Sequence, residues 1–189
     1  MDRLVSTAMA GWIAAAAVLV MVPIATLSPV SAAAFDDCAT EAASQYEPGF
    51  EEIGQDTWQI DTDAAIAACK KALEDDRESA QLKAWLARAY WSAGDSAKAA
   101  PLLEDAAAAE NLLAITMLGD MLIAGDGVDA DAERGVGLLQ IAADGGYALA
   151  LNSLGLSYDY GDGVEQDKPQ AARYYRMAAE HVGDDTTSD

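Results

Sequence analysis

One motif recurs in the C-terminal half of the chain at an offset of 36 residues, and no other feature restricts the fold as much. The motif combines a Leu-Gly pair, a Gly-Asp-Gly-Val segment, a single Asp and an Ala-Ala pair. These elements lie at 118–119, 125–128, 131 and 142–143 in one copy, and at 154–155, 161–164, 167 and 178–179 in the next. Self-similarity at a period of ~20 to 50 residues is typical of repeat arrays, whose units pack against their sequence neighbours. The sequence therefore predicts a stack of similar units.

A third, less regular copy precedes these two. Its matching elements are Trp85-Leu86-Ala87, Tyr90, Gly94-Asp95 and Ala106-Ala107. Its first helix is expected 32 rather than 36 residues before the next one, because its turn lacks the Gly-x-Gly-Val insertion.

Each copy is predicted to form two helices. In the first copy, Ser79 is expected to cap a helix that Gly94 ends. The apolar residues between them follow the i, i+3, i+4, i+7 spacing of one helix face: Leu82, Trp85, Leu86, Ala89 and Tyr90. The third copy repeats this spacing with Leu151, Leu154, Gly155 and Tyr158. Its second helix is expected to open near Pro169, where the missing N–H costs nothing.

Small residues recur at matching places in the first helices, namely Ala87, Gly119 and Gly155. We expect them to let the two helices of a unit approach closely, with the Ala178-Ala179 pair facing Gly155. Gly135, where Ala is usual, is expected to weaken its helix. Pro101 lies inside the second helix of the first copy, so that helix is expected to begin late or to kink.

These residues resemble the Sel1-like repeat, a relative of the tetratricopeptide repeat with a longer turn. The third copy matches that pattern best, and its aromatic pair is Tyr174-Tyr175. The second copy has Leu138-Leu139 in place of the aromatic pair, and the first looks more like a tetratricopeptide unit. The resemblance implies an all-α fold, an α-solenoid of antiparallel helix pairs. The expected units are a tetratricopeptide-like repeat at 79–111, Sel1-like repeats at 112–147 and 148–183, and an acidic tail at 184–189.

The N-terminal 34 residues are predicted to be a secretory signal. Arg3 precedes the apolar run 10–22, and Pro23 and Pro29 lead to small residues that allow cleavage after Ala34 or, nearly as well, after Ala32. The alternative is an uncleaved anchor, because 10–27 approaches the ~20 residues that span a bilayer. A periplasmic or secreted location follows from cleavage, with no further membrane contact expected.

Cys38 and Cys69 are the two cysteines of the chain. An oxidising compartment favours a disulfide between them, and the alternative is two buried thiols. Residues 35–78 are also similar to the cysteine-bearing N-terminal cap of exported bacterial Sel1-like proteins. We therefore predict a cap that the Cys38–Cys69 disulfide ties to the first full helix.

The formal charge of −21 excludes nucleic acid as a partner, because such binding needs clustered Lys and Arg. The chain lacks the sequence patterns of serine nucleophiles, phosphate loops and dinucleotide sites. The single His181 is expected near a helix C-terminus, and the Asp-rich turns do not have EF-hand spacing. Asp129, Asp131 and Asp167 are expected to cap helices instead. We therefore predict no catalytic residues, no metal site and no cofactor.

The concave side of the array is the predicted binding surface. If the Leu-Gly pairs face the neighbouring helix, the residues that point into the groove are Arg88, Trp91, Thr116, Asp120, Ile123, Asn152, Leu156, Asp159 and Tyr160. Trp91 and Tyr160 are the expected anchors for a protein segment. Met117 and Ser153 stand where an Asn precedes Leu-Gly in tetratricopeptide grooves that bind a C-terminal carboxylate, so that ligand is not indicated.

Two functions from different classes follow. The preferred one is a non-enzymatic protein-interaction module of the bacterial cell envelope. The alternative is an enzyme acting on cell-wall material or on β-lactams, because some cysteine-rich exported Sel1-like proteins have been linked to β-lactam binding. Those proteins carry a disulfide in nearly every repeat, whereas here both cysteines precede the repeats.

Overall fold

A computed structural model describes residues 29–184, which contain eight α-helices and one short 3-10 turn. The elements are α1 (Pro29–Ala42), η1 (Thr57–Gln59), α2 (Thr62–Asp75), α3 (Ala80–Ser92), α4 (Ser96–Ala108), α5 (Leu112–Ala124), α6 (Ala132–Asp144), α7 (Ala148–Tyr160) and α8 (Lys168–Asp184). Most of the predicted secretory signal, residues 1–28, lies outside the described residues, as does most of the acidic tail. Residues 29–34 form the first turns of α1.

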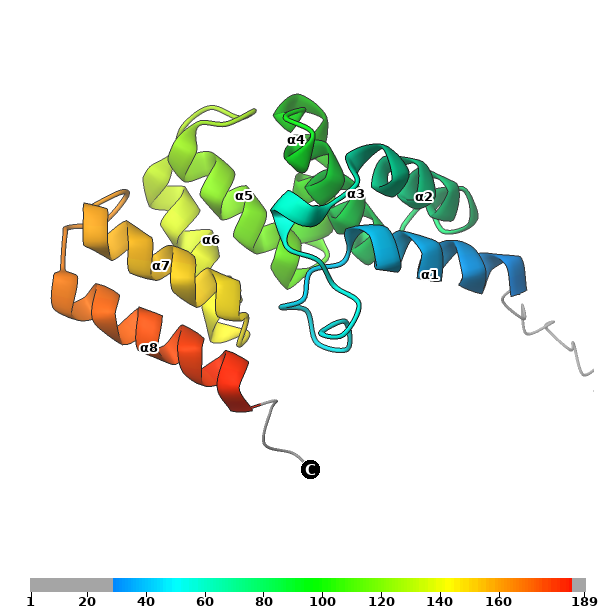
Figure 1. Cartoon of the computed structure of the whole chain (residues 1–189). Helices are drawn as coiled ribbons and strands as arrows, with labels where there is room; N and C mark the ends of the chain where they lie inside the picture. The colour runs from blue at the N-terminus through cyan, green and yellow to red at the C-terminus, as the bar shows by residue number, and fades with distance from the viewer. Residues whose placement is uncertain (1–28, 185–189) are drawn as a thin grey trace, which may run out of the picture.

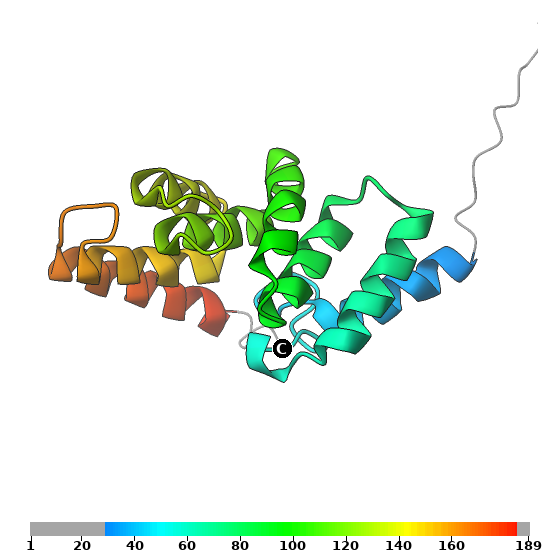
Figure 2. The same cartoon turned by 90° about the horizontal axis from the view of Figure 1, so that it is seen from above.

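Successive helices form antiparallel pairs, and the pairs follow one another along the long axis of the molecule (Figures 1 and 2). Each pair packs against the next, and α5 also contacts both α3 and α7. The predicted α-solenoid is confirmed. None of the helices in residues 29–184 combines the length and the apolar character that crossing a bilayer requires.

Local signals set the helix ends. The side chains of Ser79, Asn111 and Asp131 accept hydrogen bonds from backbone N–H groups in the first turns of α3, α5 and α6. Asp167 accepts from the N–H of Gln170 in α8, so two of the three predicted Asp caps are confirmed and Asp129 is not a cap. Gly125 and Gly161 end α5 and α7 with φ of 68° and 83°. That left-handed conformation explains the first Gly of each Gly-Asp-Gly-Val turn.

The second Gly of each turn lies against the preceding helix pair. A Cβ on Gly127 would lie 2.7 Å from the backbone of Ser96, and a Cβ on Gly163 would collide with the carbonyl of Ala132. The longer Sel1-like turn is therefore a packing element between neighbouring repeats.

The predicted close approach inside a repeat is confirmed between α5 and α6. A Cβ on Gly135 would lie 2.6 Å from the carbonyl oxygen of Gly119, and one on Gly119 would lie 3.0 Å from that of Gly135. Gly135 therefore has a packing role, because a larger residue would push the two backbones apart.

Two details of the prediction are wrong. Tyr175, rather than Ala178 or Ala179, faces Gly155, and a Cβ there would lie 2.6 Å from the Cδ1 of its ring. Of the two expectations for Pro101, the late helix start is wrong, because α4 begins at Ser96. Pro101 is the sixth residue of the helix, so the missing N–H removes one intrahelical bond without ending the helix.

The buried side chains form two clusters. The larger one runs from α1 to α5 and reaches Tyr147 and Ala150 at the start of α7. Trp85 is fully buried in it, with the rings of Phe35 and Phe50 at centroid distances of 5.2 and 4.9 Å. The smaller cluster contains Val136, Leu139, Leu151, Leu154, Tyr174 and Ala178. The last helix pair therefore packs with α6 around a small core that is separate from the larger one.

Candidate binding groove

Residues 43–61, between α1 and α2, form an irregular segment that packs along α3. As predicted, a disulfide between Cys38 of α1 and Cys69 of α2 joins the two helices on either side of this segment. The hydroxyl of Ser92 donates to the carbonyl of Thr57 at 2.8 Å, which ties the far end of the segment to the end of α3. This segment becomes one wall of the groove.

Arg88 of α3 holds the segment through its backbone. Its Nη1 donates to the carbonyls of Ala42 and Ala43, each at 2.9 Å, and its Nη2 donates to the carbonyl of Gln55. Burial lowers the pKa of Arg88, and the nearby carboxylate of Glu47 counteracts that effect. A guanidinium stays charged throughout the physiological range, so Arg88 is a buried cation committed to this contact.

Glu47 anchors the middle of the segment. One carboxylate oxygen accepts from the indole Nε1 of Trp85 at 2.8 Å and from the backbone N–H of Ser44 at 2.7 Å, and the other accepts from Gln81. Tyr147, at the start of α7, lies close enough to Glu47 and Arg88 for their charges to act on its hydroxyl. The start of the fourth helix pair, α7 and α8, therefore also lies beside the N-terminal segment.

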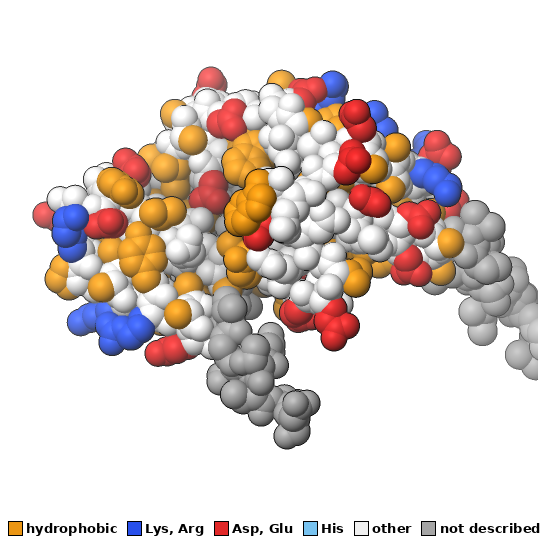
Figure 3. Space-filling view, in the orientation of Figure 1, with side chains coloured by type: hydrophobic (Ala, Val, Ile, Leu, Met, Phe, Trp, Pro, Cys, Tyr) orange, Lys and Arg blue, Asp and Glu red, His pale blue; other side chains and the backbone are white. Residues whose placement is uncertain are grey.

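A cavity of about 250 Å³ opens where this segment meets α3, α5 and α7. Its lining residues are Ser44, Tyr46, Asp56, Thr57, Trp58, Arg88, Trp91, Leu113, Thr116, Met117, Asp120, Leu149 and Ser153. Figure 3 shows hydrophobic side chains exposed near the centre of this face, with acidic side chains beside them. The cavity lining thus combines apolar side chains with the carboxylates of Asp56 and Asp120.

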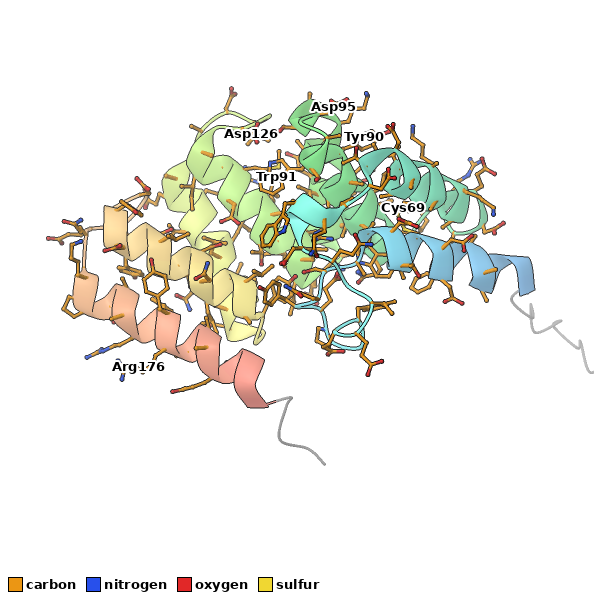
Figure 4. All side chains as sticks on the ribbon, in the orientation of Figure 1. Cys69, Tyr90, Trp91, Asp95, Asp126 and Arg176 are labelled. Atoms are coloured by element: carbon orange, nitrogen blue, oxygen red, sulfur yellow. A yellow bond between two sulfur atoms is a disulfide. The ribbon has the colours of Figure 1, made fainter. Side chains whose placement is uncertain are left out.

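Two tryptophans stand at the cavity. Trp58 of η1 is 81% exposed and Trp91 of α3 is 36% exposed. The indole Nε1 of Trp91 donates to Asp126 at 2.9 Å, a contact between α3 and the turn after α5 that can be followed in Figure 4. Hydrogen bonds from Ser96 and Trp91 lower the pKa of Asp126. Trp91 is therefore held in place, whereas the ring of Trp58 is open to solvent.

Asp120 is the carboxylate of α5 that lines the cavity, and it is partly buried. Ser153 of α7 donates to it at 3.2 Å. Burial raises the pKa of Asp120 to about 6, and the hydrogen bond from Ser153 offsets only part of that rise. Within residues 29–184, no Lys, Arg or His forms an ion pair with Asp120.

The structure brings four of the predicted groove residues to one cavity: Arg88, Trp91, Thr116 and Asp120. Thr116 is buried, and its hydroxyl donates to the carbonyl of Leu112 in its own helix. The other five lie outside the cavity lining, Ile123 on α5 and Asn152, Leu156, Asp159 and Tyr160 on α7.

A stripe along α7 connects the cavity to Tyr160. Leu149, Ser153, Leu156 and Tyr160 follow the i, i+4, i+7, i+11 spacing of one helix face. Leu149 and Ser153 line the cavity, while Leu156 and Tyr160 are 45% and 69% exposed. Asp159 lies beside the stripe and pairs with Lys168 at 3.1 Å.

Several cavity residues were not predicted from the sequence, among them Trp58, Leu113, Met117, Leu149 and Ser153. Leu113 and Met117 lie one helical turn apart on the face that carries Thr116, so the helical register was a usable signal for them. Trp58 lies in an irregular segment without periodicity, so its position depended on contacts that are distant in sequence.

The residues considered for chemistry do not converge. His181 lies on α8, where its Nδ1 is 3.0 Å from the carbonyl oxygen of Met177, one turn earlier in the same helix. In the described part of the chain, no three His, Cys, Asp or Glu residues are placed to hold a metal ion. The cavity offers shape, aromatic surface and a carboxylate, which are properties of a binding site.

Stacked antiparallel helix pairs with a cavity on one side of the stack are characteristic of helical repeat proteins. The Sel1 repeat family matches residues 112–147 and 148–181, and a tetratricopeptide repeat family matches residues 59–118. The chain is therefore a Sel1-like, tetratricopeptide-related repeat protein. No curated protein sequence matches it.

Solved structures share this fold. The crystal structure of c5321, a protective antigen present in uropathogenic Escherichia coli strains and displaying an SLR fold, matches with a TM-score of 0.58 at 24% identity. The match covers 84% of this chain and 34% of c5321, so the chain spans about a third of that protein. A Sel1 repeat protein from Oxalobacter formigenes matches with a TM-score of 0.52 at 23% identity, over 60% of this chain and 88% of the other. Both similarities concern the fold.

Proposed function

We propose that the chain is a non-enzymatic protein-interaction module of the bacterial cell envelope that holds an extended segment of a partner in its groove. The observation that carries this proposal is the cavity between the N-terminal segment and α3, α5 and α7, flanked by Trp58 and Trp91. Exposed aromatic side chains around a partly desolvated pocket are typical anchors of protein interfaces.

The stripe along α7 supports an extended ligand. A segment anchored in the cavity would continue over Leu149 and Leu156 to Tyr160, which lies at the last residue of the helix. The helix rises ~1.5 Å per residue, so this path accommodates about five residues of extended chain at ~3.3 Å each. In this proposal Trp91 and Tyr160 anchor the two ends, and Asn152 and Asp159 contact the segment from the side.

An envelope location is part of the proposal. The Cys38–Cys69 disulfide fits an oxidising compartment. Cleavage after Ala34 would leave residues 35–78 as the N-terminal cap and shorten α1 to 35–42. Mass spectrometry of the exported protein tests this, with Phe35 as the expected first residue. A mass that retains residues 1–34 would favour the anchor.

Panning a random peptide library against the protein tests the binding function. We expect enriched peptides whose affinity falls about tenfold or more for Trp58→Ala, because a contact residue of an anchor pocket is removed. Trp58 is 81% exposed, so this change leaves the fold intact. Ile141→Ala on α6 is the matched control, because Ile141 is also exposed, at 56%, but does not line the cavity. Enrichment that depends on Ile141 and not on Trp58 would contradict the proposed groove.

A further inference from the structure

Asp120 differs from the other charged groups of the cavity because no basic side chain of residues 29–184 pairs with it. Arg88 is engaged by three backbone carbonyls, and the carboxylates of Glu47 and Asp56 lie near enough to stabilise its charge. Asp56 in turn accepts a hydrogen bond from Gln45 at 2.6 Å. Asp120 has the single hydroxyl donor of Ser153 and no basic partner in the described residues.

An ionised carboxylate that is partly removed from water and unpaired is unfavourable. The pKa of Asp120 rises to about 6 for the same reason, because burial makes the ionised carboxylate less favourable than the protonated one. A cation that entered the cavity would remove this cost and gain a charge-assisted hydrogen bond.

The rest of the cavity suits the stem of a long basic side chain. Leu113, Met117 and Leu149 supply apolar surface for methylene groups. Trp58 and Trp91 line the same cavity, and aromatic rings attract ammonium and guanidinium groups. The formal charge of −21 adds a long-range attraction for basic segments.

We infer that the cavity is the seat for a lysine or arginine side chain of the bound segment, with Asp120 as its counter-ion and Leu113, Met117 and Leu149 against its stem. This inference rests on the proposed function and adds the chemistry of the segment: at least one basic residue is held at the cavity end of the groove. Ser153 orients the carboxylate, and the exposed ring of Trp58 lies on the solvent side of the site.

The test compares two small compounds of matched size. The protein, labelled with ¹⁵N, is titrated with Nα-acetyl-lysine methylamide and, separately, with Nα-acetyl-norleucine methylamide, which lacks the ammonium group. We expect the lysine compound to shift the amides of residues 116–120 and 153 and the indole of Trp91, with an affinity about fivefold or more above that of the norleucine compound. Equal affinities, or no shift from either compound, would overturn the inference.

Asp120→Asn is the variant that assigns the site. It keeps the shape of the side chain and should lower the affinity for the lysine compound to that of the norleucine compound. Asp129→Asn is the control, because it removes the same charge from an exposed position outside the cavity. Unchanged lysine affinity in Asp120→Asn would contradict the assignment.

The outcome is separable from the general proposal. If peptides from the panned library bind through Trp58 but the protein binds the lysine and norleucine compounds equally, the groove binds a segment and the proposed site for a basic residue is wrong. If no peptide binds but the lysine compound does so through Asp120, the cavity is a cation site and the extended groove is wrong.

Discussion

The two ends of this array are held together by different means. At the N-terminal end, a disulfide, a buried Arg88 and a buried Glu47 fasten an irregular segment onto α3, around a fully buried Trp85. At the C-terminal end, α6, α7 and α8 share a cluster of six buried side chains, and the ring of Tyr175 lies against Gly155. The N-terminal end is stabilised by specific polar contacts, and the C-terminal end by a small apolar core.

This difference matches what each region contributes to the groove. The N-terminal segment brings Trp58 and Asp56 to the cavity, and irregular backbone needs partners for its polar groups to hold one shape. The C-terminal pair contributes one face of a regular helix, whose backbone is satisfied internally. The cavity lies where the two regions meet, so its shape depends on both.

The largest effect is expected from Arg88→Met. This change leaves the carbonyls of Ala42, Ala43 and Gln55 without their donor and Glu47 without its nearby cation. Removing one member of a buried charged network costs about 3 to 5 kcal/mol. Urea denaturation followed by tryptophan fluorescence should show that loss, with faster hydrogen exchange in residues 43–61. Arg173→Met on the exposed face of α8 is the control, and a similar small loss for both variants would show that Arg88 does not hold the segment.

The disulfide is expected to rank next. Its cysteines are 31 residues apart, so opening it releases chain entropy in the unfolded state worth about 3 to 4 kcal/mol. Reduction should lower the melting temperature and speed hydrogen exchange in α1 and α2, while exchange in α7 and α8 stays the same. The double variant Cys38→Ala/Cys69→Ala is the control, because reductant should not affect it. Alkylation of both thiols without prior reduction would show that Cys38 and Cys69 do not form a disulfide.

Gly155→Leu probes the other end of the array. The new side chain would enter the space of the Tyr175 ring, and overpacking of this kind costs about 1 to 3 kcal/mol. We expect α7 and α8 to become protease-sensitive while the disulfide-bonded half stays folded, because a terminal repeat has one neighbour. Tyr175 is partly exposed and can move, so Gly155→Ala should cost less. Adding Tyr175→Ala to Gly155→Leu should restore part of the stability, and no rescue would mean that the ring is not the obstacle.

The smallest expected effect is that of Asp120→Asn on stability. Asp120 binds a proton more tightly in the folded chain, where its pKa is about 6, than in the unfolded chain, where it is near 3.8. Its contribution to the free energy of unfolding is therefore favourable below about pH 4 and is lost as the pH rises through 6. At pH 7.5, Asn should stabilise the protein by about 1 to 2 kcal/mol after allowance for solvent screening, and the gain should shrink toward pH 4. A gain that is independent of pH would show that Asp120 is not the group responsible.

The regular parts of the fold could be predicted from the sequence because each repeat carries local signals for where its helices begin, end and face the core. The apolar spacing of Leu82, Trp85 and Leu86, the caps at Ser79 and Asp131, and the Gly-x-Gly turns are local signals, and the structure confirms them. The pairing of Cys38 with Cys69 followed from the expected compartment. The small residue at 155 was also identified, but its partner was placed a few residues too far along α8.

The groove could be predicted only in part. Residues of α3 and α5 were placed on the correct side by helix geometry, which brought Trp91 and Asp120 to the cavity. The burial of Arg88 could not be predicted, because its partners are backbone carbonyls of a segment about 33 to 46 positions away that has no periodicity. The position of Trp58 at the cavity could not be predicted for the same reason.

The central claim is that the N-terminal segment, fixed by Arg88, completes a groove that binds a partner segment. Hydrogen exchange of the whole protein, with and without a peptide enriched in the library panning, tests it most directly. We predict slower exchange on peptide binding in residues 55–58, in the second half of α5 and along α7, and no change in the outer helices α4 and α6. Protection confined to α4 and α6, with residues 55–58 unaffected, would contradict the account.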